Sequence, residues 1–335
     1  MTVPTEKLLP LVERFTKVHL VVVGDLILDS YLECQAVGVA NEAPVPFLQI
    51  SGQSHALGGA ANVAHNLARL GVRVTLIGLI GDDQEGSILT KLAREASIDF
   101  RPLKTERPTT RKTRVQASGH YYLRLDEEEA APLNEAQGQG LLRLITESME
   151  SAQMLLASDY DKGTFKGPVV DKLQKLSAAK GFKIVGDIKP QNIQQWQKLS
   201  CITPNLPEAR DLYSRLIPGS ACPDDHLELG RVLARTLSCH VVLTLAEKGI
   251  VASTPRGEAH HFPAIGVRAE NVSGAGDTVA AVVATSLCSY AELEDAAQLA
   301  NLAAGIAISH PGTYAVTHEE LTRILQDLAN ANPGS

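Results

Sequence analysis

The chain has 335 residues, of which 44% are hydrophobic, and this length is enough to bury a large core. Its net charge of −7, with no basic block, argues against nucleic acid and against an anionic membrane as partners. No segment approaches the roughly 20 apolar residues of a membrane span, and five scattered cysteines suit a reducing compartment. We therefore expect a single cytoplasmic domain over residues 1–335.

Short apolar runs of strand length alternate with helical stretches along the chain. The strand-like runs are 20–23, 74–79, 154–157, 183–187, 201–203 and 241–245, and the clearest helical stretches are 61–70, 86–96 and 296–309. Parallel strands that are connected through helices produce this alternation of strand-like and helical segments. The sequence therefore predicts an α/β fold with a mostly parallel central sheet and helices on both faces.

Two segments interrupt this alternation. Residues 31–50 and 111–125 are strand-like, with polar residues at alternate positions, and both fall between the early strand and helix units. We expect them to lie outside the central sheet.

The most informative run is Asn-Val-Ser-Gly-Ala-Gly-Asp-Thr at residues 271–278, which opens an apolar helix. Gly274 and Gly276 leave the backbone N–H groups at the helix start free to face an anion. Asp277 can accept a proton from an attacking hydroxyl, while the amides and the helix dipole stabilise charge on a transferred phosphoryl group. A plain glycine turn with an aspartate cap is the alternative interpretation.

Two further glycine turns accompany this run. A buried strand ends in Gly24-Asp25, and Gly58-Gly59 opens a second helix that carries Asn62. A strand followed by glycine and a polar group is the ligand-site pattern of open α/β sheets. Together with the segments 202–208 and 241–249, these turns resemble the PfkB carbohydrate kinase family over nearly the whole chain.

The resemblance implies a ribokinase-like fold in which residues 31–50 and 111–125 form a small β lid over a sugar. It implies an enzyme that uses ATP and Mg²⁺ to phosphorylate a sugar hydroxyl, and it leaves room for a monovalent cation. Segments 42–46, 58–64, 107–115 and 123–126 are most similar to the heptose-7-phosphate kinases of the family. This similarity implies that the acceptor is the anomeric hydroxyl of D-glycero-β-D-manno-heptose 7-phosphate. Because lid strands often pair between subunits in the family and sheet edges need cover, we expect a homodimer.

The resemblance also assigns the residues on the sugar side. Asp277 would be the general base, and the anion hole would be formed by Gly274, Ala275 and Gly276. Ring hydroxyls would be bound by Asp25, Asp29, Asn62, Gly58 and Gly59. A substrate anion would be bound by Lys112, Arg114, Arg124 and Lys162. Residues two apart on a strand share a face, so Lys112 and Arg114 would point the same way; ordinary solvated charges are the alternative.

The nucleotide side is assigned in the same way. Asn205 and Glu208 match the N-x-x-E element of the family, in which the carboxylate acts on Mg²⁺, usually through water. Asp187 and Lys189 end a neighbouring strand, where Lys189 would meet a phosphate oxygen. The remaining residues expected near the nucleotide are Thr244, Gly249 and Asn301.

Two departures from the heptose-kinase pattern keep a second substrate class open. Residues 38–41 are Gly-Val-Ala-Asn where Arg-Ile-Ser-Pro is usual, and residues 117–120 are Ala-Ser-Gly-His where a Ser-Arg-Asn-Gln-like run is frequent. Because arginine pairs with two phosphate oxygens, these losses favour a different, unphosphorylated sugar or a nucleoside. A non-catalytic protein that binds sugar or nucleotide is the alternative from another class. We expect no companion nucleotidyltransferase domain, because the chain has no H-x-G-H element.

Overall fold

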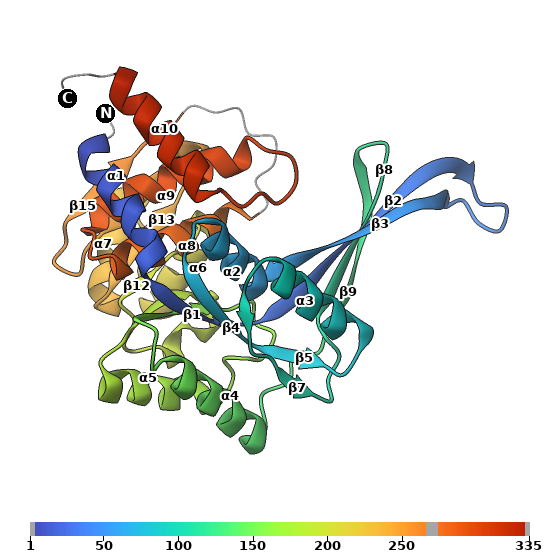
Figure 1. Cartoon of the computed structure of the whole chain (residues 1–335), viewed down its shortest axis with the longest axis horizontal. Coiled ribbons are helices and arrows are strands. Elements are labelled where there is room, and N and C mark those ends of the chain that lie inside the picture. Colours follow the sequence, from blue (N-terminus) through green and yellow to red (C-terminus); the bar gives the residue numbers. More distant parts are fainter. Residues whose placement is uncertain (1–3, 266–273, 332–335) are drawn as a thin grey trace.

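A nine-stranded sheet forms the centre of the computed structural model, which describes residues 4–265 and 274–331 (Figure 1). The strand order is β15-β14-β13-β12-β11-β10-β1-β4-β6. Strands from β13 to β6 run parallel, and β14 and β15 are antiparallel at one edge. The predicted α/β fold with a mostly parallel sheet is confirmed. The strands are β1 (His19–Gly24), β4 (Arg73–Ile77), β6 (Asp99–Phe100), β10 (Met154–Ser158), β11 (Lys183–Asp187), β12 (Cys201–Ile202), β13 (His240–Thr244), β14 (Ile250–Ser253) and β15 (Ala259–Phe262).

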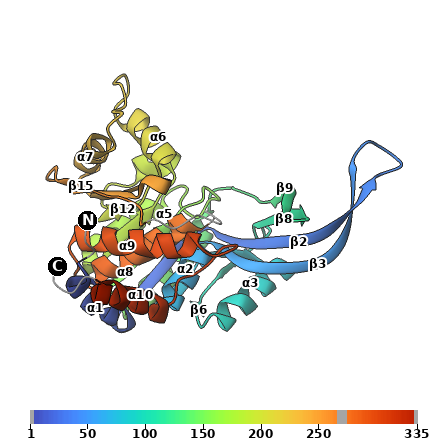
Figure 2. The same ribbon diagram turned by 90° about the horizontal axis from the view of Figure 1, so that it is seen from above.

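Helices cover both faces of this sheet, because its central strands are apolar on both sides. In β1, Leu20 and Val22 join one hydrophobic cluster, and Val21 and Val23 join the other. The first cluster is completed by α1 (Thr5–Arg14), α2 (Ala60–Arg69), α3 (Gln84–Glu95), α8 (Ala275–Cys288), α9 (Leu293–Ile308) and α10 (His318–Ala331). The second is completed by α4 (Glu135–Ser148), α5 (Val169–Lys180), α6 (Leu206–Leu216) and α7 (His226–Leu237), and Figure 2 shows α6 and α7 opposite α8, α9 and α10.

A second sheet projects from the body of the molecule (Figures 1 and 2). We call it the projecting sheet; it has the order β3-β2-β8-β9 and contains most of segments 31–50 and 111–125. Its strands are β2 (Leu26–Val39), β3 (Pro46–Gly59), β8 (Arg111–Ala117) and β9 (His120–Glu127). Leu26 pairs with Gly59, so the base of this sheet begins directly after β1 and ends directly before α2. The two turns that the sequence singles out as ligand-binding therefore lie side by side at its base.

The remaining elements are short. Strands β5 (Leu79–Gly81) and β7 (Leu103–Thr105) form a two-stranded sheet, and three 3-10 helices span Phe15–Lys17, Pro190–Gln195 and Ala246–Lys248. All five cysteines are free thiols. In the described part of the chain, no helix has the length and apolar character needed to cross a membrane.

The parallel register brings three strand ends to one edge of the central sheet. Gly24 pairs with Ser158, and Ser158 pairs with Asp187, so β1, β10 and β11 end at the same level. A Cβ atom at Gly24 would lie 2.0 Å from the carbonyl oxygen of Ser158, so this close approach requires glycine. The polar residues that follow these strands lie at the carboxyl edge, where open α/β sheets bind ligands.

Candidate active site

The glycine turn at the start of α8 lies against α2 and the segment before α10. Gly274 is in the left-handed region, with φ of +83°, and a Cβ atom there would meet Thr313 Cγ2 at 2.7 Å and Asn62 Nδ2 at 3.2 Å. A Cβ atom at Gly276 would meet nothing within 4 Å. The turn is thus packed on one side and open on the other, as an anion site at a helix start requires. Residues 271–273, which the sequence places just before the turn, lie outside the described residues.

Asp277, in the first turn of α8, is 7% exposed and is held by two side chains. The Asn62 amide donates to its Oδ2 at 2.5 Å, and the Tyr160 hydroxyl donates to its Oδ1 at 2.5 Å. Burial raises the pKa of Asp277 above its usual range, while these two hydrogen bonds act in the opposite direction. The structure therefore places Asn62, which the sequence assigns to the sugar hydroxyls, in contact with Asp277, and it adds Tyr160.

Asp25, directly after β1, holds the loop that follows β10. Its carboxylate is 2% exposed and accepts the backbone N–H groups of Tyr160 at 2.8 Å, Lys162 at 2.9 Å and Thr164 at 3.1 Å. The sequence assigns Asp25 to sugar hydroxyls, whereas the contacts observed are with the protein backbone. These bonds supply the hydrogen-bond partners that a buried carboxylate needs.

Gly58 and Gly59 are required by close packing at the base of the projecting sheet. A Cβ atom at Gly58 would lie 2.5 Å from Asp29 Oδ2, and one at Gly59 would lie 2.5 Å from the Asp25 carbonyl oxygen. Gly59 also has φ of +57°, which disfavours other residues. The two glycines therefore bring the start of α2 against both predicted sugar-binding aspartates.

Three of the four cations that the sequence assigns to a substrate anion are paired with carboxylates of the protein. Arg114 pairs with Asp29 at 2.7 Å, Arg124 with Asp126 at 2.9 Å, and Lys162 with Glu128 at 2.6 Å. No such ion pair is formed by Lys112 within the described residues; its ammonium group lies 5.9 Å from the centroid of the Tyr160 ring. Burial and the neighbouring Lys162 lower the pKa of Lys112.

Negative charge is concentrated on the nucleotide side of the predicted site, at the end of β11. Burial, together with the neighbouring Glu208 and Asp277, raises the pKa of Asp187 to about 8. Burial also raises the pKa of Asp159 to about 6. Lys189 forms an ion pair with Glu208, and this pair raises the pKa of Lys189 although burial alone would lower it. The sequence predicts that Asp187, Lys189 and Glu208 lie close together. It does not predict that Asp159 adds a further buried carboxylate at this edge.

Asn205 and Glu208 cap α6 as a reciprocal pair. Asn205 Oδ1 accepts the Glu208 N–H at 2.9 Å, and the Glu208 carboxylate accepts the Asn205 N–H at 3.1 Å. Asn205 also forms a parallel bridge with Thr244 at the end of β13. Three residues assigned to the nucleotide are therefore grouped at the start of α6.

Gly249 and Asn301 both contact the segment that follows β15. A Cβ atom at Gly249 would lie 2.1 Å from the Phe262 carbonyl oxygen, and the Asn301 amide donates to the Pro263 carbonyl at 2.8 Å. The amide of Asn301 is thus directed to the backbone, so its place near the nucleotide stays a prediction.

Tyr160 is a residue that the sequence left without a role, although it follows the apolar run 154–157 that the sequence identifies as a strand. The ammonium groups of Lys112 and Lys189 both lie near its ring, at 5.9 Å and 5.5 Å from the ring centroid. The sequence did contain a signal for Tyr160, because it comes two residues after the buried strand β10, at the edge where ligand-binding residues gather.

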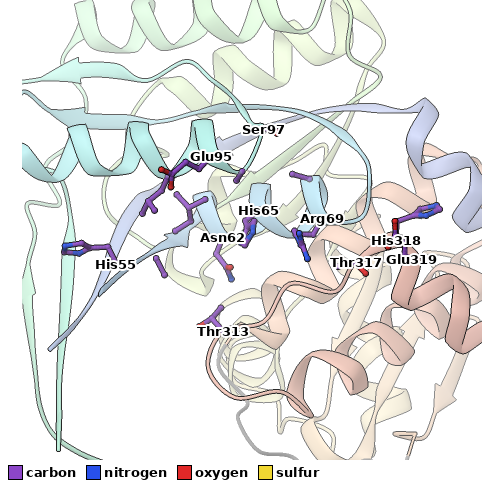
Figure 3. A pocket seen from close by; sticks show the side chains of 15 residues that line it. His55, Asn62, His65, Arg69, Glu95, Ser97, Thr313, Thr317, His318 and Glu319 are labelled. Atoms are coloured by element: carbon purple, nitrogen blue, oxygen red, sulfur yellow. The ribbon is translucent and has the colours of Figure 1, made fainter. Parts of the chain in front are cut away.

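A cavity of about 680 Å³ runs along α2 and reaches Asn62 (Figure 3). Asn62, His65 and Arg69 line it from α2. Residues from the end of α3 form one side, and residues from the segment before α10 and its first turn form the other. This volume lies within the range of small-molecule sites. The cavity therefore gives a ligand room beside one of the two side chains that hold Asp277.

Comparison with known proteins places these features in a family, because the profile of the pfkB family carbohydrate kinases matches residues 17–320. The chain belongs to this family. It is a sugar kinase, so the alternative of a non-catalytic binding protein is not supported.

Curated relatives agree with this assignment. The chain is 32% identical over 322 residues to the bifunctional protein HldE of Desulfatibacillum aliphaticivorans, a match that covers 94% of this chain and 65% of that protein. It is 35% identical over 314 residues to the bifunctional protein HldE of Shewanella sediminis, covering 93% and 64% respectively. The chain thus spans less than two thirds of the length of these relatives.

Solved structures confirm the ribokinase-like fold. Phosphofructokinase-2 from Escherichia coli in complex with potassium has a TM-score of 0.78 and 20% identity, covering 93% of this chain and 99% of that one. Ribokinase from Thermotoga maritima has a TM-score of 0.70 and 17% identity, covering 92% and 99%. At these identities the likeness concerns the fold.

Proposed function

We propose that this kinase transfers the γ-phosphoryl group of ATP to the anomeric hydroxyl of a phosphorylated heptose, with Asp277 as the general base. The observation that carries the proposal is the buried Asp277 carboxylate, held by Asn62 and Tyr160 in the first turn of α8. Because burial raises the pKa of Asp277, its carboxylate binds a proton more readily than an exposed aspartate does. It would accept the proton of the sugar hydroxyl as that oxygen attacks the γ-phosphorus.

The start of α8 supports charge stabilisation in the same step. The backbone N–H groups of Ala275, Gly276 and Asp277 precede the first hydrogen bond of the helix, which runs from Thr278 to the Gly274 carbonyl, and the open side at Gly276 leaves space for an anion. Together with the helix dipole, these groups would stabilise the charge that develops on the transferred phosphoryl group.

The nucleotide phosphates would lie near Lys189 and Glu208. Burial raises the pKa values of Asp159 and Asp187, and neighbouring carboxylates raise them further; a divalent cation would offset this concentration of negative charge. Within the described residues no group of three or more acidic, histidine or cysteine side chains is arranged to hold a metal ion. Glu208 would hold Mg²⁺ together with the ATP, and the ion would neutralise charge on the phosphates.

Lys112 supports a phosphorylated acceptor. Arg114, Arg124 and Lys162 already have carboxylate partners. The ammonium group of Lys112, in contrast, is half-buried beside the ring of Tyr160, the residue that holds the proposed general base Asp277. A phosphate monoester would supply the counter-charge that burial of this ammonium group calls for. The curated relatives named bifunctional protein HldE, together with the sequence resemblance to heptose-7-phosphate kinases, favour a heptose as the sugar.

The two missing arginines weigh less against this acceptor than the sequence suggests. Gly38 lies nine residues beyond Asp29 along β2, roughly 30 Å at the usual rise of a strand. Ser118 and Gly119 form the β8–β9 turn, where both residues have positive φ. Both positions are thus toward the far end of the projecting sheet, away from Asp29 and the base of that sheet.

The projecting sheet also supports association with a second copy of the chain. Its edge strands β3 and β9 have unpaired backbone groups along one side. Nine large apolar side chains of this sheet and its β2–β3 turn are each at least 42% exposed, namely Val37, Val39, Val45, Phe47, Ile50, Tyr121, Tyr122, Leu123 and Leu125. Because an exposed apolar sheet with free edges favours self-association, we propose a homodimer through this sheet.

The first prediction concerns Asp277. Asp277→Asn keeps the shape of the side chain but removes the base, so turnover should fall by roughly 10²- to 10⁴-fold while ATP binding stays within a few fold. Steady-state rates and ATP titration check this, with Asp327→Asn on the exposed face of α10 as the matched control. Near-normal turnover of Asp277→Asn would remove Asp277 from the mechanism.

The second prediction concerns Glu208. Glutamine can still complete the cap of α6, so Glu208→Gln should fold normally while losing the charge that acts on the metal. We expect the Mg²⁺ concentration for half-maximal rate to rise roughly 10- to 100-fold, with a smaller change in sugar KM. A Mg²⁺ titration measures both; an unchanged Mg²⁺ response would exclude Glu208 from the site.

The third prediction concerns the dimer. Light scattering at micromolar concentration should give the mass of two chains, and the double variant Leu123→Glu, Leu125→Glu should give one chain, because both changes place charge on one face of β9. Tyr290→Glu is the control, since Tyr290 is 91% exposed outside this sheet. A fully active wild-type monomer would contradict the proposal.

The fourth prediction concerns the acceptor. The wild type should have a higher kcat/KM for heptose 7-phosphate than for neutral hexoses, pentoses and nucleosides. Lys112→Met should lower kcat/KM for the phosphorylated sugar by roughly 10- to 100-fold, the worth of one charged hydrogen bond. Lys175→Met on α5 serves as the control. Preference of the wild type for a neutral sugar would overturn the acceptor and leave the kinase assignment standing.

A further inference from the structure

We propose that Tyr160 is a positioning residue for the general base: its hydroxyl fixes the Asp277 carboxylate together with Asn62, and its ring joins the sugar side of the site to the nucleotide side. The inference rests on the function proposed above and names a residue to which neither the sequence assignments nor the comparisons give a role. It starts from the 2.5 Å hydrogen bond between Tyr160 and Asp277.

Each part of Tyr160 is fixed by a different element. Its backbone N–H is held by Asp25 at the end of β1, and the next residue, Asp161, has φ of +59°. Its ring lies near Lys112 of β8 and Lys189 after β11, and its hydroxyl reaches Asp277 of α8. A side chain that is fixed at three points can hold a carboxylate in one orientation.

The phenol acts as a donor at neutral pH. Burial, the Asp277 carboxylate and the neighbouring Asp187 raise the pKa of Tyr160 well above its usual range, so the hydroxyl keeps its proton. The charged groups that face Tyr160 and Asp277 are Asp29 from β2, Lys112 from β8, Asp187 from the end of β11, and Lys189. A donor to the ionised carboxylate favours the ionised form, which is the form that accepts a proton from the sugar.

A second interpretation is that the phenol occupies the place of the sugar hydroxyl and must leave before catalysis. The anchoring of the loop favours the positioning role, because movement of the loop would break the three hydrogen bonds to Asp25. A carboxylate oxygen also has two lone pairs, so Asp277 Oδ1 retains one for the substrate while Tyr160 stays bound.

The test is Tyr160→Phe, which removes only the hydroxyl. If Tyr160 positions and ionises the base, kcat should fall roughly 10- to 100-fold, because a hydrogen bond to a charged group is lost. The sugar KM should change much less. Without the donor the carboxylate binds its proton more tightly, so the acid limb of the kcat/KM profile should move to higher pH by about one pH unit.

The matched control is Tyr314→Phe, which removes another phenol-to-carboxylate hydrogen bond, the one from Tyr314 to Glu320 at 3.0 Å. This variant should leave the rate and the pH profile unchanged. If a thermal unfolding measurement shows that Tyr160→Phe is not folded, Tyr160→His replaces it. The imidazole of this variant keeps a hydrogen-bond donor, so the acid limb of the kcat/KM profile should stay near its wild-type position.

Three results would overturn the proposal. An unchanged rate and profile would show that the hydroxyl is not needed. A slower enzyme with an unmoved acid limb would indicate a merely structural role. A lower sugar KM with undiminished kcat would show that the phenol competes with the substrate hydroxyl. An inactive wild type would instead refute the proposed function, and the role of Tyr160 would fall with it.

Discussion

The carboxylate of Asp25 is the interaction on which the rest of the site depends. It lies at the end of β1 and accepts three backbone N–H groups from the loop after β10. These bonds set the position of Tyr160 at one end of the segment and of Thr164 at the other. Because Tyr160 reaches Asp277 on α8, a single buried carboxylate links the centre of the sheet to the helix that carries the proposed base.

A second constraint is electrostatic. The parallel strands bring Asp159 and Asp187 to one edge, where Asp277 of α8 and Glu208 of α6 add further carboxylates and Lys189 is a nearby cation. Like charges close together in a partly buried site raise one another's pKa. A nucleotide phosphate alone would add to this negative charge, so a metal ion that accompanies it fits the charge balance of the site.

The projecting sheet has two regions of different character. At its base, Asp29, Arg114 and Lys112 lie beside the start of α2 and share the polar surroundings of the site. Toward its far end, apolar side chains such as Phe47 and Leu123 are exposed. The same four strands therefore place ion pairs beside the proposed substrate and apolar surface away from it, which accords with a sheet that serves both a site and an interface.

The sequence by itself determined the central sheet, because apolar runs such as 20–23 and 154–157 are buried on both faces and have few alternatives to a parallel sheet. It also indicated the glycine turns at Gly58 and Gly274, where a Cβ atom would meet the Asp29 side chain at Gly58, and the Thr313 side chain together with a positive φ at Gly274. Asp277 stood out for the same reason, because its place at a helix start is a local property.

The tertiary structure alone decided which partner each polar group has. Strand periodicity puts Lys112 and Arg114 on one face, but only the pairing of β8 with β2 shows that Arg114 meets Asp29 while Lys112 meets the Tyr160 ring. The contact of Tyr160 with Asp277 joins residues 117 positions apart in the chain. Periodicity fixes the direction of a side chain within its own element. A hydrogen-bond partner instead depends on how distant elements pack, and no local pattern in the sequence encodes that packing.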